Sequence, residues 1–191
     1  MQEENFSAEL SAEREFSIMN IANKLTMFRV ILIPVFLVVI YSNFAGFEYV
    51  ALSVFILACI TDFADGMVAR KYNLTTVFGK FMDPLADKIL VIAALSVFTE
   101  WGKMPAWALI TVIAREFTVT ALRLVAADSG RVIAAGRSGK IKTAATMICV
   151  CVMLLNVAKV ADNFCIAIIL VTTVYSGVEY LVTNRDFFIN K

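Results

Sequence analysis

Four aspartates lie close together in an otherwise apolar part of the chain, and they are the residues best suited to chemistry. They form the run Asp62-x2-Asp65-Gly66-x2-Ala69-Arg70-x8-Gly79-x3-Asp83-x3-Asp87. A charged side chain at the centre of a membrane helix costs about 2.5–3.5 kcal/mol on insertion scales. Four acids in one stretch therefore need a neutralising partner, and a divalent cation is the first candidate. The run predicts a membrane-embedded, metal-dependent enzyme.

The spacing of the aspartates suits two neighbouring helices. At about 100° per residue, one face of the first helix carries five of the positions: Asp62, Asp65, Gly66, Ala69 and Arg70. Asp83 and Asp87, four residues apart, share one face of the next helix. The connection over 71–78 is short, so the helices should be antiparallel and the carboxylates should converge. Oxygen ligation without histidine favours Mg²⁺ or Mn²⁺, and four aspartates can hold two such ions for phosphoryl displacement.

Composition favours a membrane protein and restricts the chemistry. Of the 191 residues, 60 % are hydrophobic, and the mean hydropathy is +0.80. A net charge of +1 argues against a nucleic-acid partner. Histidine is absent, so acid–base chemistry is left to carboxylates, Lys, Tyr or Cys. The cysteines lie in apolar runs without a CxxC motif, which indicates buried apolar residues: Cys59, Cys149, Cys151 and Cys165.

The apolar segments predict an all-α integral membrane protein with six transmembrane helices. They cover residues 26–43, 48–70, 82–100, 104–126, 141–158 and 163–183. Residues 1–18 are acidic and are expected to form a flexible extension before a six-span domain over 19–191. Residues 18–25 should form a short interfacial helix. Basic residues gather on flanks that six spans put on one side, so both termini are predicted to be cytoplasmic.

Other interpretations of the aspartates stay open at this point. They could form structural salt bridges with nearby cations, namely Arg70, Lys80 and Lys88. They could also belong to a cation or proton transport path. Such a path needs polar groups through to the opposite membrane face, and the outer halves of the spans offer none. The third alternative is a membrane scaffold without catalysis.

The aspartate run resembles the signature of the CDP-alcohol phosphotransferases, integral membrane enzymes of phospholipid synthesis. The resemblance covers nearly everything from Asn20 to about Asp186. It implies a homodimer of six-helix chains in the cytoplasmic membrane of a bacterium, with the active site facing the cytoplasm. It also implies transfer of a phosphatidyl or similar group from a CDP-linked donor to an alcohol, with release of CMP.

The resemblance further implies individual roles. Asp62 and Asp83 would bridge two metals, Asp65 would complete one site and Asp87 the other. Asp87 would also be the base that takes the proton of the acceptor hydroxyl. Six residues fall where the family holds CDP: Asn23, Thr26, Gly66, Ala69, Arg70 and Thr76. For the N-terminal segment, the alternative is a helix cap by Asn23 with Lys24 and Arg29 snorkelling to the interface.

Three blocks, 78–88, 114–123 and 135–143, resemble family members that use CDP-diacylglycerol and sn-glycerol 3-phosphate. Four basic residues in the last two blocks are expected to bind the acceptor's phosphate: Arg115, Arg123, Lys140 and Lys142. The alternative is an Arg115–Glu116 or cross-helix ion pair, with binding of anionic headgroups. Inositol phosphate, serine or phosphatidylglycerol remain possible acceptors within the family.

Overall fold

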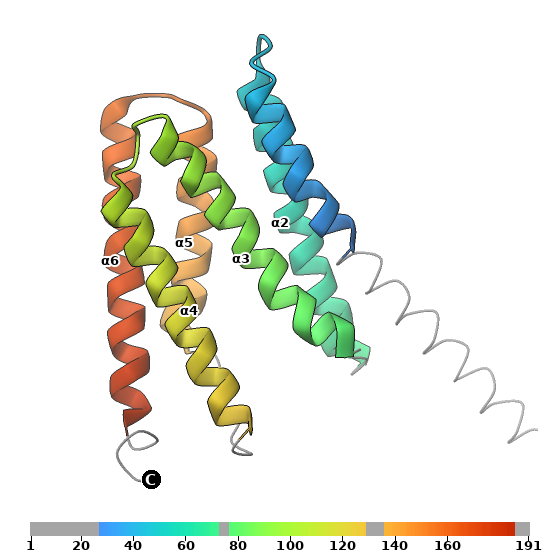
Figure 1. Cartoon of the computed structure of the whole chain (residues 1–191), viewed down its shortest axis with the longest axis vertical. Coiled ribbons are helices and arrows are strands. Elements are labelled where there is room, and N and C mark those ends of the chain that lie inside the picture. Colours follow the sequence, from blue (N-terminus) through green and yellow to red (C-terminus); the bar gives the residue numbers. More distant parts are fainter. Residues whose placement is uncertain (1–26, 73–76, 129–135, 186–191) are drawn as a thin grey trace, which may run out of the picture. The chain divides into compact units, whose positions relative to one another are not determined.

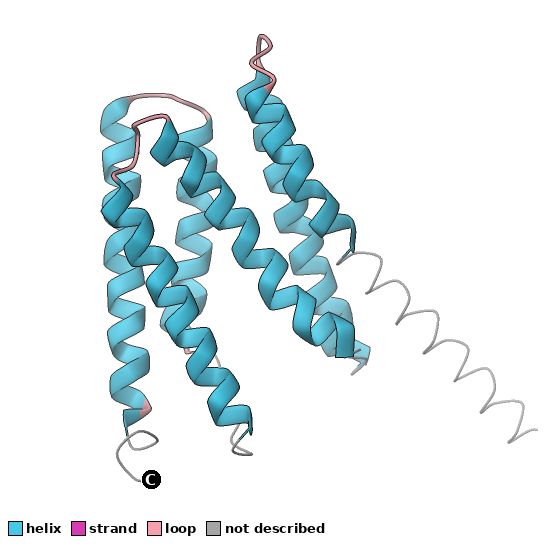
Figure 2. Cartoon of the chain, viewed as in Figure 1, coloured by secondary structure: helices cyan, strands magenta, loops and turns pink. Residues whose placement is uncertain are grey.

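The computed structural model describes residues 27–72, 77–128 and 136–185, with side chains at all of these positions except 64–72, 77–87, 127 and 128. In these ranges the chain is helix and loop without a strand (Figure 2). The helices are Met27–Tyr41, α2 (Phe47–Tyr72), α3 (Val77–Glu100), α4 (Ala106–Asp128), α5 (Arg137–Leu154) and α6 (Lys159–Thr183) (Figure 1). For the described part of the chain, the prediction of an all-α fold with six helices is confirmed.

The third helix begins earlier than the sequence suggested. The expected start near residue 82 was wrong, because α3 begins at Val77 and passes through Gly79 and Pro84. The predicted start was placed after Lys80 because the apolar run begins there. A single charged residue does not end a helix, however. Proline has no N–H to donate to the carbonyl one turn back, but the helix continues through it. Two later boundaries also differ, since α5 ends at Leu154 and α6 starts at Lys159.

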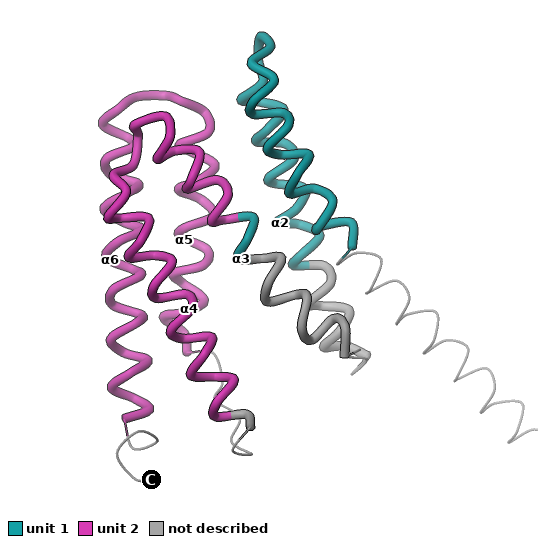
Figure 3. Tube along the Cα trace, viewed as in Figure 1, with its two compact units in different colours: residues 1–90 teal, residues 91–191 magenta. Residues whose placement is uncertain are grey.

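The chain divides into two units, residues 1–90 and 91–191, which Figure 3 colours separately. In the first unit, the Met27–Tyr41 helix and α2 form a hairpin. Its turn contains Asn43 and Gly46, both with positive φ, at 45° and 83°. The hairpin is held by Phe36 and Phe55, which are fully buried and whose ring centroids lie 6.0 Å apart. This aromatic pair fixes the register between the two helices.

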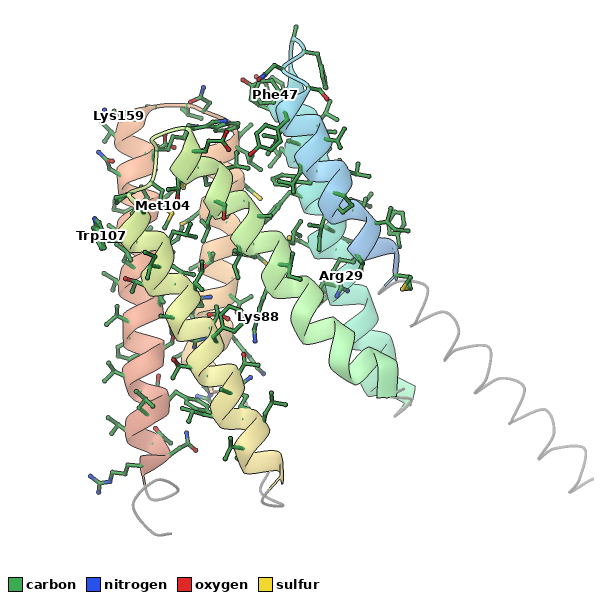
Figure 4. All side chains as sticks on the ribbon, in the orientation of Figure 1. Arg29, Phe47, Lys88, Met104, Trp107 and Lys159 are labelled. Atoms are coloured by element: carbon green, nitrogen blue, oxygen red, sulfur yellow. The ribbon has the colours of Figure 1, made fainter. Side chains whose placement is uncertain are left out.

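In the second unit, α6 packs against both α4 and α5. The inner face of α4 is small and apolar, with Ala108, Val112, Val119 and Ala126 buried. Its outer face is apolar too, with more than 60 % of each side chain exposed at Trp107, Ile110, Phe117 and Leu124. Figure 4 shows Trp107 projecting outward from α4. A helix that is apolar on both faces is typical of a buried or membrane-spanning environment.

Length and composition single out one of the described helices as a candidate span. That helix is α6, and Met27–Tyr41 is also apolar but shorter. α4 carries Arg115, Glu116 and Arg123 within its length, and these charges interrupt an otherwise apolar sequence. Six membrane crossings therefore stay a prediction.

Lys103, between α3 and α4, closes one end of the second unit. Its ammonium donates a 2.9 Å hydrogen bond to the carbonyl of Met153 in the last turn of α5. The same ammonium lies 3.9 Å from the carboxylate of Asp162 in the first turn of α6. It also lies 5.2 Å from the centroid of the Trp101 ring. Cations favour helix C-termini and anions favour N-termini, so this cluster joins two helix ends and a loop.

Replacing Asp162 by Asn should destabilise the second unit. The substitution leaves the largely buried Lys103 ammonium without a neighbouring negative charge, which costs about 1–3 kcal/mol. The melting temperature of the purified protein in detergent should fall by several degrees. An unchanged melting temperature would show that the Lys103–Asp162 pair contributes nothing to stability.

Candidate active site

Asp62 is the member of the aspartate run whose side chain the structure describes. Its Oδ1 lies 2.8 Å from Nη1 of Arg29, whose side chain is 1 % exposed, whereas that of Asp62 is 35 % exposed. Figure 4 shows Arg29 reaching from the Met27–Tyr41 helix toward α2. The buried arginine thus places a cation against a carboxylate that remains accessible.

The register of the hairpin explains this pairing. Arg29 lies seven residues before Phe36, and Asp62 lies seven residues after Phe55. Seven residues are about two helical turns, or roughly 10 Å. Because the helices are antiparallel, Arg29 and Asp62 lie in the same direction and at the same distance from the aromatic pair. They are therefore opposite each other across the hairpin. The N-terminal motif that includes Arg29 is thereby tied to the aspartate run.

The other three aspartates lie on helices that are continuous through their positions. Asp65 is in α2, three residues after Asp62, and Asp83 and Asp87 are in α3. Each pair therefore occupies one face of its helix, about 60° apart in α2 and about 40° apart in α3. The side chains of Asp65, Asp83 and Asp87 lie outside the described ones. Convergence of the four carboxylates stays a prediction.

Most residues expected to bind CDP also lie beyond what the structure describes. Gly66, Ala69 and Arg70 are placed in α2 by their backbone alone. Asn23, Thr26 and Thr76 fall outside the described residues. Among the described side chains, no three acidic or cysteine residues gather in a way that could hold a metal ion. With only one of the four aspartate side chains described, the metal site is neither confirmed nor contradicted.

The donor set nevertheless fits a hard divalent cation. Asp62 offers a carboxylate that is 35 % exposed, with its Oδ1 paired to the Arg29 guanidinium. Oxygen-only donors from aspartates are the ligands that Mg²⁺ and Mn²⁺ prefer.

Two of the four residues expected to bind the acceptor's phosphate meet at one carboxylate. Arg115 Nη1 and Lys142 Nζ both donate to Oε1 of Glu116, at 2.9 and 2.6 Å. All three side chains are mostly buried. Lys142 reaches from α5 to α4, so both ion pairs foreseen as the alternative are present. Lys140, in the first turn of α5, is exposed and is not part of this contact.

Arg123, two turns after Arg115 in α4, contacts α6. Its guanidinium carbon lies 5.5 Å from the centroid of the Tyr180 ring. Arg123 Nε, Arg115 Nε and Tyr180 Oη are buried and have no hydrogen-bond partner among the described residues. Buried polar groups are rarely left unsatisfied, so these atoms set this cluster apart from the rest of the described core.

Sequence reasoning did not assign a site role to Glu116, Gly177 or Tyr180. Glu116 was visible only as a neighbour of Arg115. A sequence pattern could have pointed to α6 as part of the site. Small and polar residues recur on one face of this apolar helix: Thr173, Ser176, Gly177 and Tyr180. Such positions in apolar helices mark close helix packing or a polar partner.

Comparison with known proteins leads to the same family as the aspartate run. The sequence profile of the family described as CDP-alcohol phosphatidyltransferase matches residues 19–176. Similar proteins named CDP-diacylglycerol–glycerol-3-phosphate 3-phosphatidyltransferase occur in Bacillus subtilis (42 % identity over 185 residues), Salmonella typhimurium (40 % over 179) and Escherichia coli K12 (38 % over 179). The alignments cover 87 % of this chain in each case, and 96 %, 95 % and 95 % of the relatives. Both the profile match and the extent of these alignments show that the chain belongs to the CDP-alcohol phosphatidyltransferase family.

Proposed function

We propose that this protein transfers the phosphatidyl group of CDP-diacylglycerol to sn-glycerol 3-phosphate. The products are phosphatidylglycerophosphate and CMP, and the pathway is anionic phospholipid synthesis. The observation that carries the proposal is that relatives about 40 % identical over nearly their whole length bear the name of this activity. The buried Arg115, Lys142 and Arg123 support it, since an acceptor with a phosphate needs cations.

The reaction takes place at a membrane. The apolar outer face of α4 and the apolar length of α6 support a membrane location. We propose six membrane-spanning helices in a bacterial cytoplasmic membrane. The positive-inside rule puts both termini and the active site on the cytoplasmic side. The extension expected over 1–18 and the interfacial helix expected over 18–25 lie outside the described residues. We propose that the enzyme is a homodimer.

Binding of the donor rests on the aspartate run and its neighbours. Asp62, Asp65, Asp83 and Asp87 would hold two divalent cations, which when bound stabilise negative charge on the diphosphate. Arg70 presents a fork of donors suited to the same diphosphate. The small residues Gly66 and Ala69 would let CDP approach α2, and Asn23, Thr26 and Thr76 would complete its binding site.

Transfer proceeds by direct attack on the phosphorus that carries diacylglycerol. The carboxylate of Asp87 takes the proton from the 1-hydroxyl of glycerol 3-phosphate, and the hydroxyl oxygen forms the new bond to phosphorus. The bond from that phosphorus to the oxygen bridging to CMP breaks, and CMP leaves with the electron pair. Arg115, Arg123 and Lys142 would bind the acceptor's own phosphate.

An acceptor panel tests the proposal directly. Purified protein in detergent with CDP-diacylglycerol and a divalent cation is given radiolabelled glycerol 3-phosphate, inositol phosphate, serine or phosphatidylglycerol. Label should enter lipid, with matching CMP release, from glycerol 3-phosphate. Labelling from one of the other acceptors would reassign the enzyme within its family. Cation flux in liposomes without any CMP release would favour a transporter instead.

Replacing Arg123 by Gln should weaken binding of the acceptor while leaving the donor unaffected. Loss of one charged hydrogen bond to a phosphate costs about 1.5–3 kcal/mol, which corresponds to a KM for glycerol 3-phosphate roughly 10–100-fold higher. The KM for CDP-diacylglycerol should stay within about twofold. Arg137→Gln is the matched control, because Arg137 is an exposed arginine at the start of α5. Equal KM values for glycerol 3-phosphate in the two variants would contradict the role of Arg123.

A further inference from the structure

One carboxylate oxygen in the second unit receives two cations from different helices. Oε1 of Glu116 accepts from Arg115 on α4 and from Lys142 on α5. Neighbouring residues on a helix are about 100° apart and do not normally pair. Arg115 and Glu116 do so here, and the same carboxylate oxygen also accepts from Lys142 of α5.

The side chain of Arg115 lies close to a glycine of α6. A Cβ on Gly177 would lie 3.2 Å from Arg115 Cγ, which is tighter than usual, whereas one on Gly139 of α5 would make an ordinary contact of 3.9 Å with its Nη2. A glycine inside a helix lowers helix stability by about 1 kcal/mol relative to alanine. A glycine at position 177 therefore indicates that close packing requires it. Gly177 allows the aliphatic part of the Arg115 side chain to pack against α6. Glu116 holds the guanidinium of the same side chain by a hydrogen bond.

The charges of the cluster are not balanced internally. Among the described residues, Arg115 and Lys142 pair with one carboxylate, so these three side chains together carry a net positive charge suited to an anion. Without Glu116, Arg115 and Lys142 would be two mostly buried like charges close together, and each would move away from the other. Nε of Arg115 is buried and has no hydrogen-bond partner among the described residues.

We infer that Glu116 is a positioning residue for the acceptor. Its carboxylate holds Arg115 and Lys142 at the spacing in which both contact the phosphate of glycerol 3-phosphate, and Glu116 itself does not touch that phosphate. The inference rests on the proposed function and adds a specificity role for an acidic residue. It therefore predicts that removing a negative charge weakens the binding of a negatively charged substrate, the reverse of simple electrostatics.

The first experiment measures both KM values for Glu116→Gln in the purified full-length enzyme. The KM for glycerol 3-phosphate should rise about 10-fold or more, and the KM for CDP-diacylglycerol should stay within about twofold. Glu116→Asp keeps the charge on a shorter side chain and should recover part of the loss. Gly177→Ala leaves Glu116 intact but displaces the stem of Arg115, and it should raise the same KM by a smaller factor.

Asp162→Asn is the matched control for a structural effect. Like Glu116, Asp162 is a buried acid paired with a lysine in the second unit. It should lower the melting temperature and leave the KM for glycerol 3-phosphate unchanged. In a Lys142→Gln background, Glu116→Gln should add less to that KM than it does alone, because one of its two partners is already gone.

The outcomes separate the inference from the proposed function. If the wild-type enzyme releases no CMP with glycerol 3-phosphate, the proposed function itself is wrong. If the wild-type is active and Glu116→Gln has an unchanged KM for glycerol 3-phosphate, the positioning role is overturned. An equal rise in both KM values overturns it too. If Glu116→Gln does not fold, Glu116→Asp decides, and an unchanged KM for glycerol 3-phosphate in that variant overturns the role.

Discussion

Replacing Asp87 by Asn is expected to lower kcat for CMP release by at least about 1,000-fold. General-base catalysis contributes about 100- to 10,000-fold, and Asp87 is proposed as a metal ligand as well. The amide cannot take the proton of the acceptor hydroxyl, although it nearly matches the carboxylate in size. The chain contains no histidine that could replace the carboxylate as base. Single-turnover release of CMP from radiolabelled CDP-diacylglycerol measures the effect on the chemical step.

Binding of the donor separates a catalytic defect from a folding defect. Asp87→Asn should still bind CDP-diacylglycerol, with reduced affinity, in an equilibrium binding assay. Asp162→Asn serves as the control, because it removes a carboxylate that lies outside the aspartate run. A kcat for Asp87→Asn within about tenfold of the wild-type value would contradict the role of Asp87.

Removing divalent cations should abolish activity to a similar extent. Treatment with EDTA should lower CMP release at least about 1,000-fold, since charge on the reacting diphosphate would then be stabilised by side chains alone. Added Mg²⁺ or Mn²⁺ should restore activity.

A ligand variant links this cation requirement to the aspartate run. Asp62→Asn removes one ligand and should raise the cation concentration needed for half-maximal activity about tenfold or more. Full activity in EDTA, or an unchanged cation requirement in Asp62→Asn, would contradict the proposed ligands.

Much of the fold follows from local sequence patterns. Apolar runs of about 20 residues predict each helix, and the turn at Asn43 and Gly46 separates the first two. The contact between Arg29 and Asp62 was not predictable from these runs, because it depends on which apolar residues meet across the hairpin. Once Phe36 and Phe55 are known to pair, the positions of both charged residues follow.

The acceptor cluster was predictable in its cations but not in its arrangement. Arg115, Arg123 and Lys142 stand out because basic residues in apolar helices need a partner. Their link through Glu116 joins residues 26 positions apart, a contact set by how α4, α5 and α6 pack. The start of α3 was missed because Lys80 and Pro84 were treated as boundary residues, although the helix continues through both.

Anomalous diffraction from crystals grown with Mn²⁺ would locate the cations bound by the aspartate run without reference to activity. We expect two peaks about 3.5–4 Å apart, each within about 2.1 Å of carboxylate oxygens, with Asp62 and Asp83 contacting both peaks. Asp65 should contact one of them and Asp87 the other. Peaks located elsewhere, or carboxylates from α2 and α3 that point away from one another, would contradict the proposed metal site.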